Sequence, residues 1–401
     1  MSSSLKVISN NLANLNTDGY KEEKLDFASI FSDAQSTSGN GDPIQTGNGV
    51  SVAARVSDFT NGDTSATNIS SNMALQGNGF FVVKDSTGTY YTRNGDFTVN
   101  SDGNLCNASG QLVMGYAATD GVVSTTSGLT SINVSSVSSI PASATTSFSI
   151  NANLNSSTAT SSTYDSSITV YDSLGESHVL TVEYTKTDTN AWSYSISIPS
   201  ADLSSGSGTS TVVSSGTLAF NSSGVLTSPT GKVTGIDISG LADGASDMSL
   251  TWNLDGSGTT PTITQFDSTS STSSTDQNGY AVGTLTGYSI NSDGTVEGQF
   301  SNEQTLALGQ VSLASFANNQ GLSQVGSTSD YQATASSGAA VIGVANAGGN
   351  GTITGGEVEK SNVDLSTEFT NMIVAQQSYQ ANAKALTTLN QVVQSTLQLI
   401  S

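Results

Sequence analysis

The chain has 401 residues, enough for about two or three domains with more than one hydrophobic core. Its 32 acidic side chains outnumber the 10 basic ones and give a net charge of −22, which argues against binding to nucleic acid or to an anionic membrane surface. The single cysteine excludes an intramolecular disulfide, and no apolar run approaches the roughly 20 residues that span a bilayer.

The first predicted element is a short amphipathic helix from Ser4 to about Asn16. Its apolar side chains are spaced three, four and three residues apart, as on one helix face, at Leu5, Ile8, Leu12 and Leu15. Gly19 then favours the left-handed turn that ends a helix. These residues lack the apolar segment of a cleaved secretory signal, so we expect any export to use another route.

The middle of the chain predicts strands and turns. Residues 32–72 are polar and glycine-rich, and we expect an extended connector there. Apolar and polar residues alternate at 178–184 and at 192–198, which is typical of half-buried strands. The Asp-Gly pairs in Asn100–Gly103 and Asn291–Gly294 predict tight hairpin turns. Long loops or linkers are predicted for the Ser- and Thr-rich stretches 155–167, 204–216 and 256–276.

A long C-terminal helix gives the strongest single pattern. Asp364 fits the N-cap position, and Glu368 falls in the first turn, where the helix dipole favours an anion. Steps of alternately four and three residues predict a coiled-coil seam, interrupted only at Gln376 and Asn390. The apolar seam residues are Leu365, Phe369, Met372, Tyr379, Ala383, Leu386, Val393, Leu397 and Ile400.

These elements predict a mainly β protein whose N- and C-terminal helices pair as a coiled-coil stalk, with β-rich domains between them. The alternative is two ordinary helices packed on a globular core. The predicted parts are helical terminal segments at 1–31 and 357–401, the connector at 32–72, an inner β-domain at 73–150 and 276–356, and an inserted outer β-domain at 151–275.

Residues that carry chemistry are scarce. A Ser-His-Asp arrangement needs a histidine beside a nucleophile, and the only histidine, His178, falls within an alternating strand. Zinc sites of the common kinds need several His or Cys ligands, and the chain has one of each. Paired carboxylates stay open as catalytic groups, although no pair stands out. We expect no enzymatic activity, no cofactor and no metal.

Six sequence blocks carry a resemblance to a known family. They are Val7–Asn14, Thr17–Lys21, Ala74–Val82, Tyr91–Phe97, Ser361–Leu365 and Gln376–Lys384. In this order they resemble the flagellar rod, hook and hook-associated family, in both the terminal regions and the β-core. Family members usually carry a longer helix before the first block, so we expect that Met1 is not the full-length start.

Within this family, rod proteins lack a large insertion in the β-domain. Residues 150–275 form such an insertion, which contains the block Ile168–Gly175. Together with Gly279-Tyr280 and Leu306–Val311, the insertion resembles the hook subunits of the family. Two alternatives are a distal rod protein with an insertion and a secreted β-rich adhesin or surface protein.

The resemblance implies a structural subunit that self-assembles into a curved, flexible, hollow tube and transmits torque from the rod to the filament. It implies as partners further copies of the chain, the distal rod protein, the hook cap protein and the hook–filament junction protein. It implies no nucleic acid and no membrane insertion. The location would be the extracellular hook, reached without a cleaved signal peptide. The two apolar helix stripes would form the assembly interface.

Overall fold

A computed structural model describes the backbone of residues 2–30, 33–37, 43–46, 49–255, 260–326 and 329–400. Met1, expected not to be the full-length start, and the side chain of the predicted seam residue Ile400 lie outside the described residues. The chain forms two compact units. Unit 1 comprises Met1–Val137, Gly287–Gln299 and Thr305–Ser401, and unit 2 comprises Ser138–Thr286 and Phe300–Gln304.

The fold is mainly β, as predicted, and the α-helices of the described residues lie at the two ends of the chain. Helix α1 spans Ser2–Ala13 and helix α2 spans Leu365–Ile400. The backbone N–H of Thr367 donates to Asp364 Oδ1 at 2.7 Å, so Asp364 caps α2 as predicted. Neither helix, over the residues described, has the length and apolar character needed to cross a bilayer.

Unit 1 contains most of the short strands. Before residue 137 they are β1 (Glu23–Ser29), β2 (Asp33–Thr37), β3 (Pro43–Thr46), β4 (Val50–Ser57), β5 (Thr64–Ala66), β6 (Met73–Gln76), β7 (Phe80–Lys84), β8 (Thr89–Thr92), β9 (Thr98–Val99), β10 (Leu105–Cys106), β11 (Leu112–Thr119), β12 (Val122–Val123) and β13 (Thr130–Ser131). After residue 290 they are β26 (Thr295–Phe300), β27 (Thr305–Ser315), β28 (Ser323–Val325), β29 (Asp330–Gln332), β30 (Val341–Val344), β31 (Thr352–Gly355) and β32 (Glu357–Glu359). A short 3-10 helix spans Asn319–Gly321.

The centre of unit 1 is a sheet with the strand order β27-β11-β7-β8-β29-β28. Apolar side chains from its two faces form two clusters, one around Phe81, Leu105 and Val311 and one around Phe80 and Tyr331. Strands from both ends of the chain meet beside it, because β31 pairs with β6 and β32 pairs with β5. Unit 1 therefore depends on both ends of the sequence.

Two terminal assignments differ from the sequence-based expectation. The stretch 32–72, expected to be an extended connector, contains paired strands where it is described, because β4 pairs with β1 and β2 with β3. The segments 1–31 and 357–401 are not wholly helical, since they also hold β1 and β32. Helix α1 ends at Ala13, and Gly19, expected to end it, lies with a φ of +69° in the turns that lead to β1.

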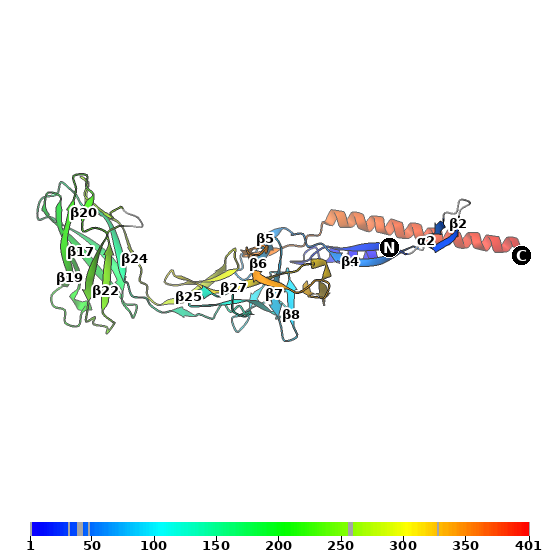
Figure 1. Ribbon diagram of the computed structural model, residues 1–401, viewed down its shortest axis with the longest axis horizontal. Coiled ribbons are helices and arrows are strands. Elements are labelled where there is room, and N and C mark those ends of the chain that lie inside the picture. Colours follow the sequence, from blue (N-terminus) through cyan, green and yellow to red (C-terminus); the bar gives the residue numbers. More distant parts are fainter. Residues whose placement is uncertain are drawn as a thin grey trace. The chain divides into compact units, whose positions relative to one another are not determined.

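Unit 2 is a sandwich of two five-stranded sheets, visible as two layers in Figure 1. One sheet contains β15 (Ser147–Asn153), β21 (Lys232–Ile238), β22 (Met248–Asn253), β23 (Ile263–Thr264) and β24 (Ser271–Gln277). The other contains β16 (Thr163–Tyr171), β17 (Ser177–Asp188), β18 (Ala191–Pro199), β19 (Ser210–Phe220) and β20 (Leu226–Ser228). A 3-10 helix, η1, spans Ser200–Asp202. Strands β14 (Ser139–Ile140) and β25 (Gly283–Ile290) lie in the segments where the chain passes between the units.

One hydrophobic core fills the sandwich. Tyr184 and Tyr194 from one sheet lie with their ring centroids 6.2 and 5.2 Å from Trp252 of the other. The predicted alternation at 178–184 and 192–198 is confirmed, with every second side chain buried in this core. The expected boundaries at 150/151 and 275/276 fall inside β15 and β24, which pair with each other.

Candidate assembly interface at the chain termini

A buried cluster of charges joins the two ends of the chain in unit 1. Lys21 Nζ lies 2.6 Å from Glu359 Oε1, and Arg93 Nη1 lies 3.5 Å from Glu359 Oε2. All three side chains are at most 1% exposed. The backbone N–H of Gly62 donates to Glu359 Oε1 at 2.8 Å, and Lys21 donates to the Thr60 carbonyl at 2.7 Å. Burial lowers the pKa of Lys21, and the charge of Glu359 offsets part of that effect.

Asn11 connects α1 to the segment that follows it. Its Oδ1 accepts hydrogen bonds from the Tyr20 hydroxyl and from the backbone N–H of Glu23, both at 3.0 Å. Its Nδ2 donates to the Glu23 carbonyl at 2.9 Å. An amide is the side chain that supplies both a donor and an acceptor at this position. Asn11 therefore fixes the angle between α1 and β1.

Asn362 makes the equivalent connection just before α2. Its Oδ1 accepts from the backbone N–H of Glu22 at 2.7 Å, and its Nδ2 donates to the Asp58 carbonyl at 2.9 Å. Next to it, Lys360 Nζ lies 2.8 Å from Asp18 Oδ1. We call the charge cluster, Asn11 and Asn362 together the helix root, because they hold α1 and α2 at one place in unit 1.

Helix α1 lies against the first turns of α2. Val7 and Asn11 are buried on α1, and Glu368 and Ala375 are buried on α2, at 2% and 7% exposure. Burial raises the pKa of Glu368, a weak hydrogen bond from Asn371 lowers it, and the negative charge of Glu22 raises it further. Glu368 Oε2 has no hydrogen-bond partner among the described residues.

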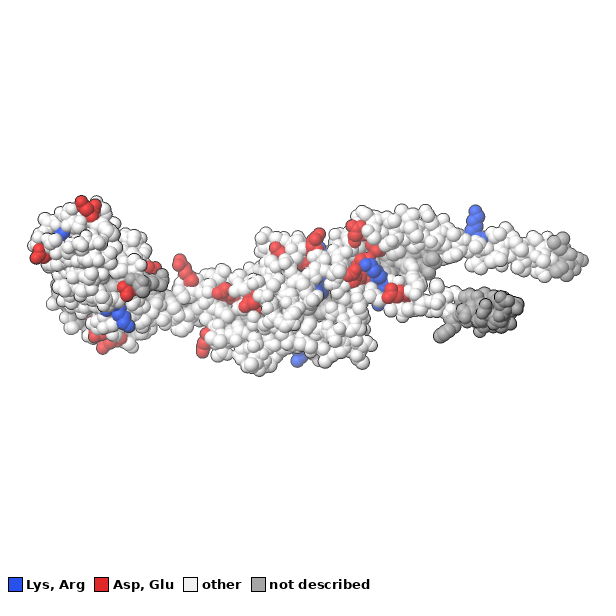
Figure 2. All heavy atoms as spheres, turned by 45° about the horizontal axis from the view of Figure 1, so that its top comes forward, with Lys and Arg blue, Asp and Glu red and all other residues white. Residues whose placement is uncertain are grey.

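Beyond this contact, the apolar face of α2 is exposed. Val393 follows Ala375 by about five helical turns and therefore lies on the same side of the helix. Leu386, Leu389 and Leu397 flank Val393 on this face. These three leucines and Val393 are between 55% and 63% exposed. The only charged residues of α2 are Glu368 and Lys384, so most of its surface is uncharged (Figure 2). The α2 stripe, defined as Leu386, Leu389, Val393 and Leu397, is not covered by any other part of the described residues.

The predicted seam residues have different environments. Leu5, Ile8 and Leu12 of α1 are half-buried, as is Leu15 in the turn that follows the helix. On α2, Met372 is half-buried, while the exposed ones are Leu365, Phe369, Tyr379, Ala383, Leu386, Val393 and Leu397. Because α1 has 12 residues and α2 has 36, α1 covers only the start of the longer helix. The predicted seams leave out Val7, Asn11, Ala375 and Leu389, although a 3.6-residue period places the last two on the same helix face as Val393.

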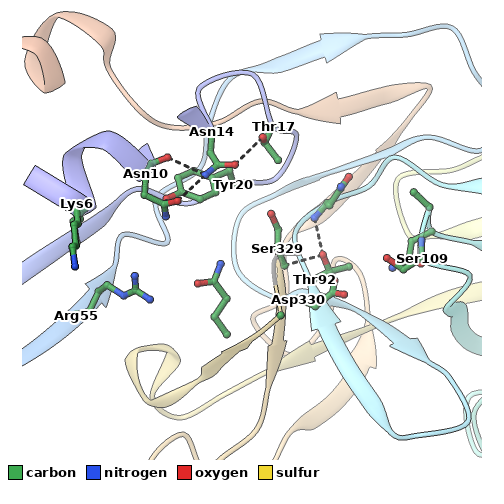
Figure 3. A pocket seen from close by; sticks show the side chains of 16 residues that line it. Lys6, Asn10, Asn14, Thr17, Tyr20, Arg55, Thr92, Ser109, Ser329 and Asp330 are labelled. Carbon is green, nitrogen blue, oxygen red and sulfur yellow. Dashed lines mark hydrogen bonds between the residues drawn. The ribbon is translucent and has the colours of Figure 1, made fainter. Parts of the chain in front are cut away.

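A hollow of about 760 Å³ lies on another side of α1. Figure 3 shows Lys6 and Asn10 of α1 and Arg55 of β4 along one part of it, with Thr92 and Asp330 from the central sheet along another. Arg55 Nη1 is also 3.1 Å from Glu23 Oε2. The hollow is therefore lined by polar side chains from α1 and from the β-core.

Family models match most of the chain in order. They are "Flagella basal body rod protein" at residues 2–21, "Flagellar hook protein FlgE/F/G D1 domain" at 74–155, "Flagellar basal body protein FlaE D2 domain" at 138–280 and "Flagellar basal body rod FlgEFG protein C-terminal" at 354–399. The first and last of these contain most of the helix root and both helices. The third covers the predicted insertion at 150–275.

Similar proteins agree with these matches. The flagellar hook protein FlgE of Escherichia coli is 37% identical over 98% of this chain and 96% of its own length, and that of Treponema pallidum is 31% identical over the same shares. The crystal structure of Helicobacter pylori FlgE2 shares the fold, with a TM-score of 0.52 at 14% identity over 72% of this chain and 98% of that one. The protein thus belongs to the flagellar hook protein family and is a structural subunit of the extracellular hook of the bacterial flagellum.

Proposed function

We propose that the α2 stripe is the main assembly surface, covered in the hook by terminal helices of neighbouring copies. The observation that carries this proposal is an apolar face of α2 that stays exposed among the residues that the structure describes. Helices bundled in this way would line the inner wall of a hollow tube, with the β-units outside. Contacts repeated without closure of a ring produce such a filament.

Covering the exposed apolar side chains would favour assembly. Complete burial of a Leu or Val side chain contributes about 1.5–3 kcal/mol, so covering the part still exposed contributes about 1 kcal/mol for each residue of the α2 stripe. The predicted seam residues Leu365, Phe369, Tyr379 and Ala383 extend the same surface toward the helix root, and Met372 and α1 adjoin it. Each further subunit in the tube would add the same favourable free energy of burial.

The helix root would transmit force. Its buried ion pairs and asparagine bonds connect both helices to the β-core, so a twist applied to the inner wall reaches the outer parts of the subunit. This supports a hook that is curved and flexible and that transmits torque from the rod to the filament. The polar hollow beside α1 offers a second contact surface for a neighbouring copy.

The remaining parts of the proposal follow from the family. The specific partners would be the distal rod protein, the hook cap protein and the hook–filament junction protein, and export would proceed without a cleaved signal peptide. Unit 1 would supply the inner β-domain and unit 2 the inserted outer domain. The chain would act without enzymatic activity, cofactor, nucleic acid or membrane insertion.

A pair of double variants tests the α2 stripe. Leu386→Glu with Val393→Glu places two carboxylates in the proposed interface, seven residues apart. Thr388→Glu with Ser395→Glu adds the same charges at the same spacing on the opposite side of α2, where both hydroxyls are exposed and donate to backbone carbonyls. Electron microscopy and sedimentation velocity then compare tube formation by the parent chain and both variants.

We expect the Leu386/Val393 variant to remain monomeric and the Thr388/Ser395 variant to form tubes like the parent. The thermal unfolding of the monomers should be nearly equal, because all four positions are exposed in the single chain. Tubes of normal yield from the Leu386/Val393 variant would refute the α2 stripe as the assembly surface.

A further inference from the structure

Unit 2 holds a cluster of one imidazole and three carboxylates, separate from the assembly surface. Asp172 follows β16, His178 lies in β17 and Asp243 lies in the loop between β21 and β22. One donor atom of each lies within 4.8 Å of the others. His178 Nε2 is 3.2 Å from Asp172 Oδ2, and His178 Nδ1 is 3.0 Å from Asp202 Oδ2. Three separate segments of unit 2 therefore bring potential metal ligands together.

The orientation of Asp172 is fixed by the backbone. Its Oδ1 accepts hydrogen bonds from the N–H groups of Leu174, Gly175 and Glu176 at 2.8, 2.7 and 3.0 Å. The residue is completely buried. Since these bonds occupy Oδ1, the other oxygen is directed at His178 and the cluster. A carboxylate held in this way needs no reorganisation to act as a ligand.

Asp202 fixes the other side of the imidazole ring. A metal-bound histidine usually donates its second ring N–H to a carboxylate, which sets the tautomer and the direction of the ligating nitrogen. Asp202, at the end of η1, stands in that relation to His178 Nδ1. The ring therefore presents Nε2 to Asp172 and Asp243.

The charges of the cluster are unbalanced. In the part of the chain that the structure describes, the ion pairs of Asp172 and Asp202 are both with His178. Asp243 adds a third carboxylate close by. Even a protonated ring would leave two negative charges in excess around a buried imidazole, which burial makes unfavourable. A divalent cation at Nε2 would displace the proton there and reduce the excess from two negative charges to one.

We propose that Asp172, His178 and Asp243 bind a divalent first-row transition-metal ion, with Zn²⁺ as the representative case. His178 Nε2 and one oxygen of each aspartate would be the ligands, and water would complete a four-coordinate site. Imidazole with carboxylates suits Zn²⁺ and related ions. Zinc–ligand distances of about 2.0–2.2 Å bring tetrahedral ligand atoms closer together than 4.8 Å, so we expect Asp243 to move inward on binding. Its side chain is exposed on a loop, where such a shift is accessible.

A proton is the competing occupant of Nε2. Burial alone would lower the pKa of His178, but hydrogen bonds to Asp202 and Asp172 outweigh it and raise the pKa. A proton on Nε2 would be shared with Asp172 Oδ2 at 3.2 Å, and a proton on Nδ1 with Asp202 Oδ2 at 3.0 Å. Metal binding would transfer the Nε2 proton to solvent and leave the Nδ1 proton on Asp202's side. This exchange distinguishes the proposed site from loose binding to surface carboxylates.

The test uses the full chain without a polyhistidine tag, after treatment with a chelator. Because His178 is the only histidine, ¹⁵N-histidine labelling gives one imidazole in the NMR spectrum. We expect calorimetry to show one Zn²⁺ per chain, and NMR to show loss of the Nε2 proton alone. The tryptophans, Trp192 and Trp252, both lie in unit 2, so their fluorescence reports its unfolding. The midpoint should rise by about 5–10 °C at a free Zn²⁺ concentration one hundred times Kd.

Variants separate the site from nonspecific binding. Asp243→Asn, at an exposed position, should weaken Zn²⁺ binding by at least about tenfold, and His178→Asn should abolish it. Asp276→Asn, an exposed change of equal charge on β24, should bind Zn²⁺ like the parent. The proposal is overturned if the parent chain shows no binding at about 1 mM Zn²⁺. It is also overturned if Asp243→Asn and Asp276→Asn bind equally, or if the Nε2 proton remains when the metal is bound.

Discussion

Replacement of Glu359 by alanine would leave two buried cations in the helix root without their anion. Lys21 and Arg93 are 0% and 1% exposed, so neither gains water without local opening. Removal of one partner from a buried ion pair costs about 3–5 kcal/mol. The backbone N–H of Gly62 also loses its acceptor. We therefore expect Glu359→Ala to destabilise the helix root by about 4 kcal/mol.

Hydrogen exchange followed by mass spectrometry measures this change locally. A loss of about 4 kcal/mol corresponds to an increase of about a thousandfold in exchange rates that depend on opening of the root. Peptides from β1 and β32 should show it. Trp192 and Trp252 both lie in unit 2, so the urea midpoint of tryptophan fluorescence should stay unchanged.

Glu357→Ala is the matched control. Glu357 lies two residues earlier in the same strand, is only half-buried and takes no part in the charge cluster. We expect its effect to stay within about 0.5 kcal/mol. Equal exchange rates for Glu357→Ala and Glu359→Ala would refute the reasoning. The buried ion pairs of Glu359 would then add no more to local stability than the half-buried Glu357 side chain does.

Two further changes test the helix root. Gly19→Ala should destabilise unit 1 by about 2 kcal/mol or more, because the φ of +69° disfavours alanine and a Cβ would lie 2.4 Å from the backbone nitrogen of Asn94; an unchanged exchange rate in β1 peptides would contradict this. The pKa of Glu368 is raised above its ordinary 4.5, so its contribution to stability is present below that pH and is lost as the pH rises through the folded-state pKa. Glu368→Gln should therefore be more stable than the parent by about 1 kcal/mol at neutral pH and equal to it in acid. A thermal unfolding midpoint below that of the parent at neutral pH would contradict this, because it would show that the buried carboxylate is stabilising.

The long helix and the sandwich strands could be predicted because their side chains repeat with the period of the structure. Asp364 and the apolar positions after it located α2 to the residue, and the alternation at 178–184 and 192–198 located two central strands. In the sandwich strands one face is buried, and for α2 we propose burial of one face on assembly. The repeated side-chain pattern reflects that burial.

Other strands carry no such record. Ser271–Gln277 lies in a stretch predicted to be a loop, yet it forms β24 and pairs with β15 through backbone hydrogen bonds that any sequence supplies. The strand β19, Ser210–Phe220, was hidden in the same way by serine and threonine. A side-chain pattern cannot reveal a strand whose pairing is decided by its neighbour.

The candidate sites depended on contacts between distant segments. Lys21 and Glu359 were each visible as charged residues near an end of the chain, but nothing in the sequence pairs them. In the sequence, His178 and the single cysteine were too few ligands for a common zinc site. The structure instead surrounds His178 with aspartates from other segments. The coiled-coil pattern predicted which α2 residues share an apolar face. It did not predict that α1 covers only the first turns of α2.

The helix root also determines when the subunit is complete. Lys21 and Glu359 are 338 residues apart, so their ion pair closes a loop that contains almost the whole chain. Unit 2 lies mainly within the continuous segment Ser138–Thr286 and contains its own core, so it can fold while the two ends are still apart. We expect the root to form last. A partly synthesised or partly exported chain would then present no finished helix pair, and premature polymerisation would be avoided by the order of folding.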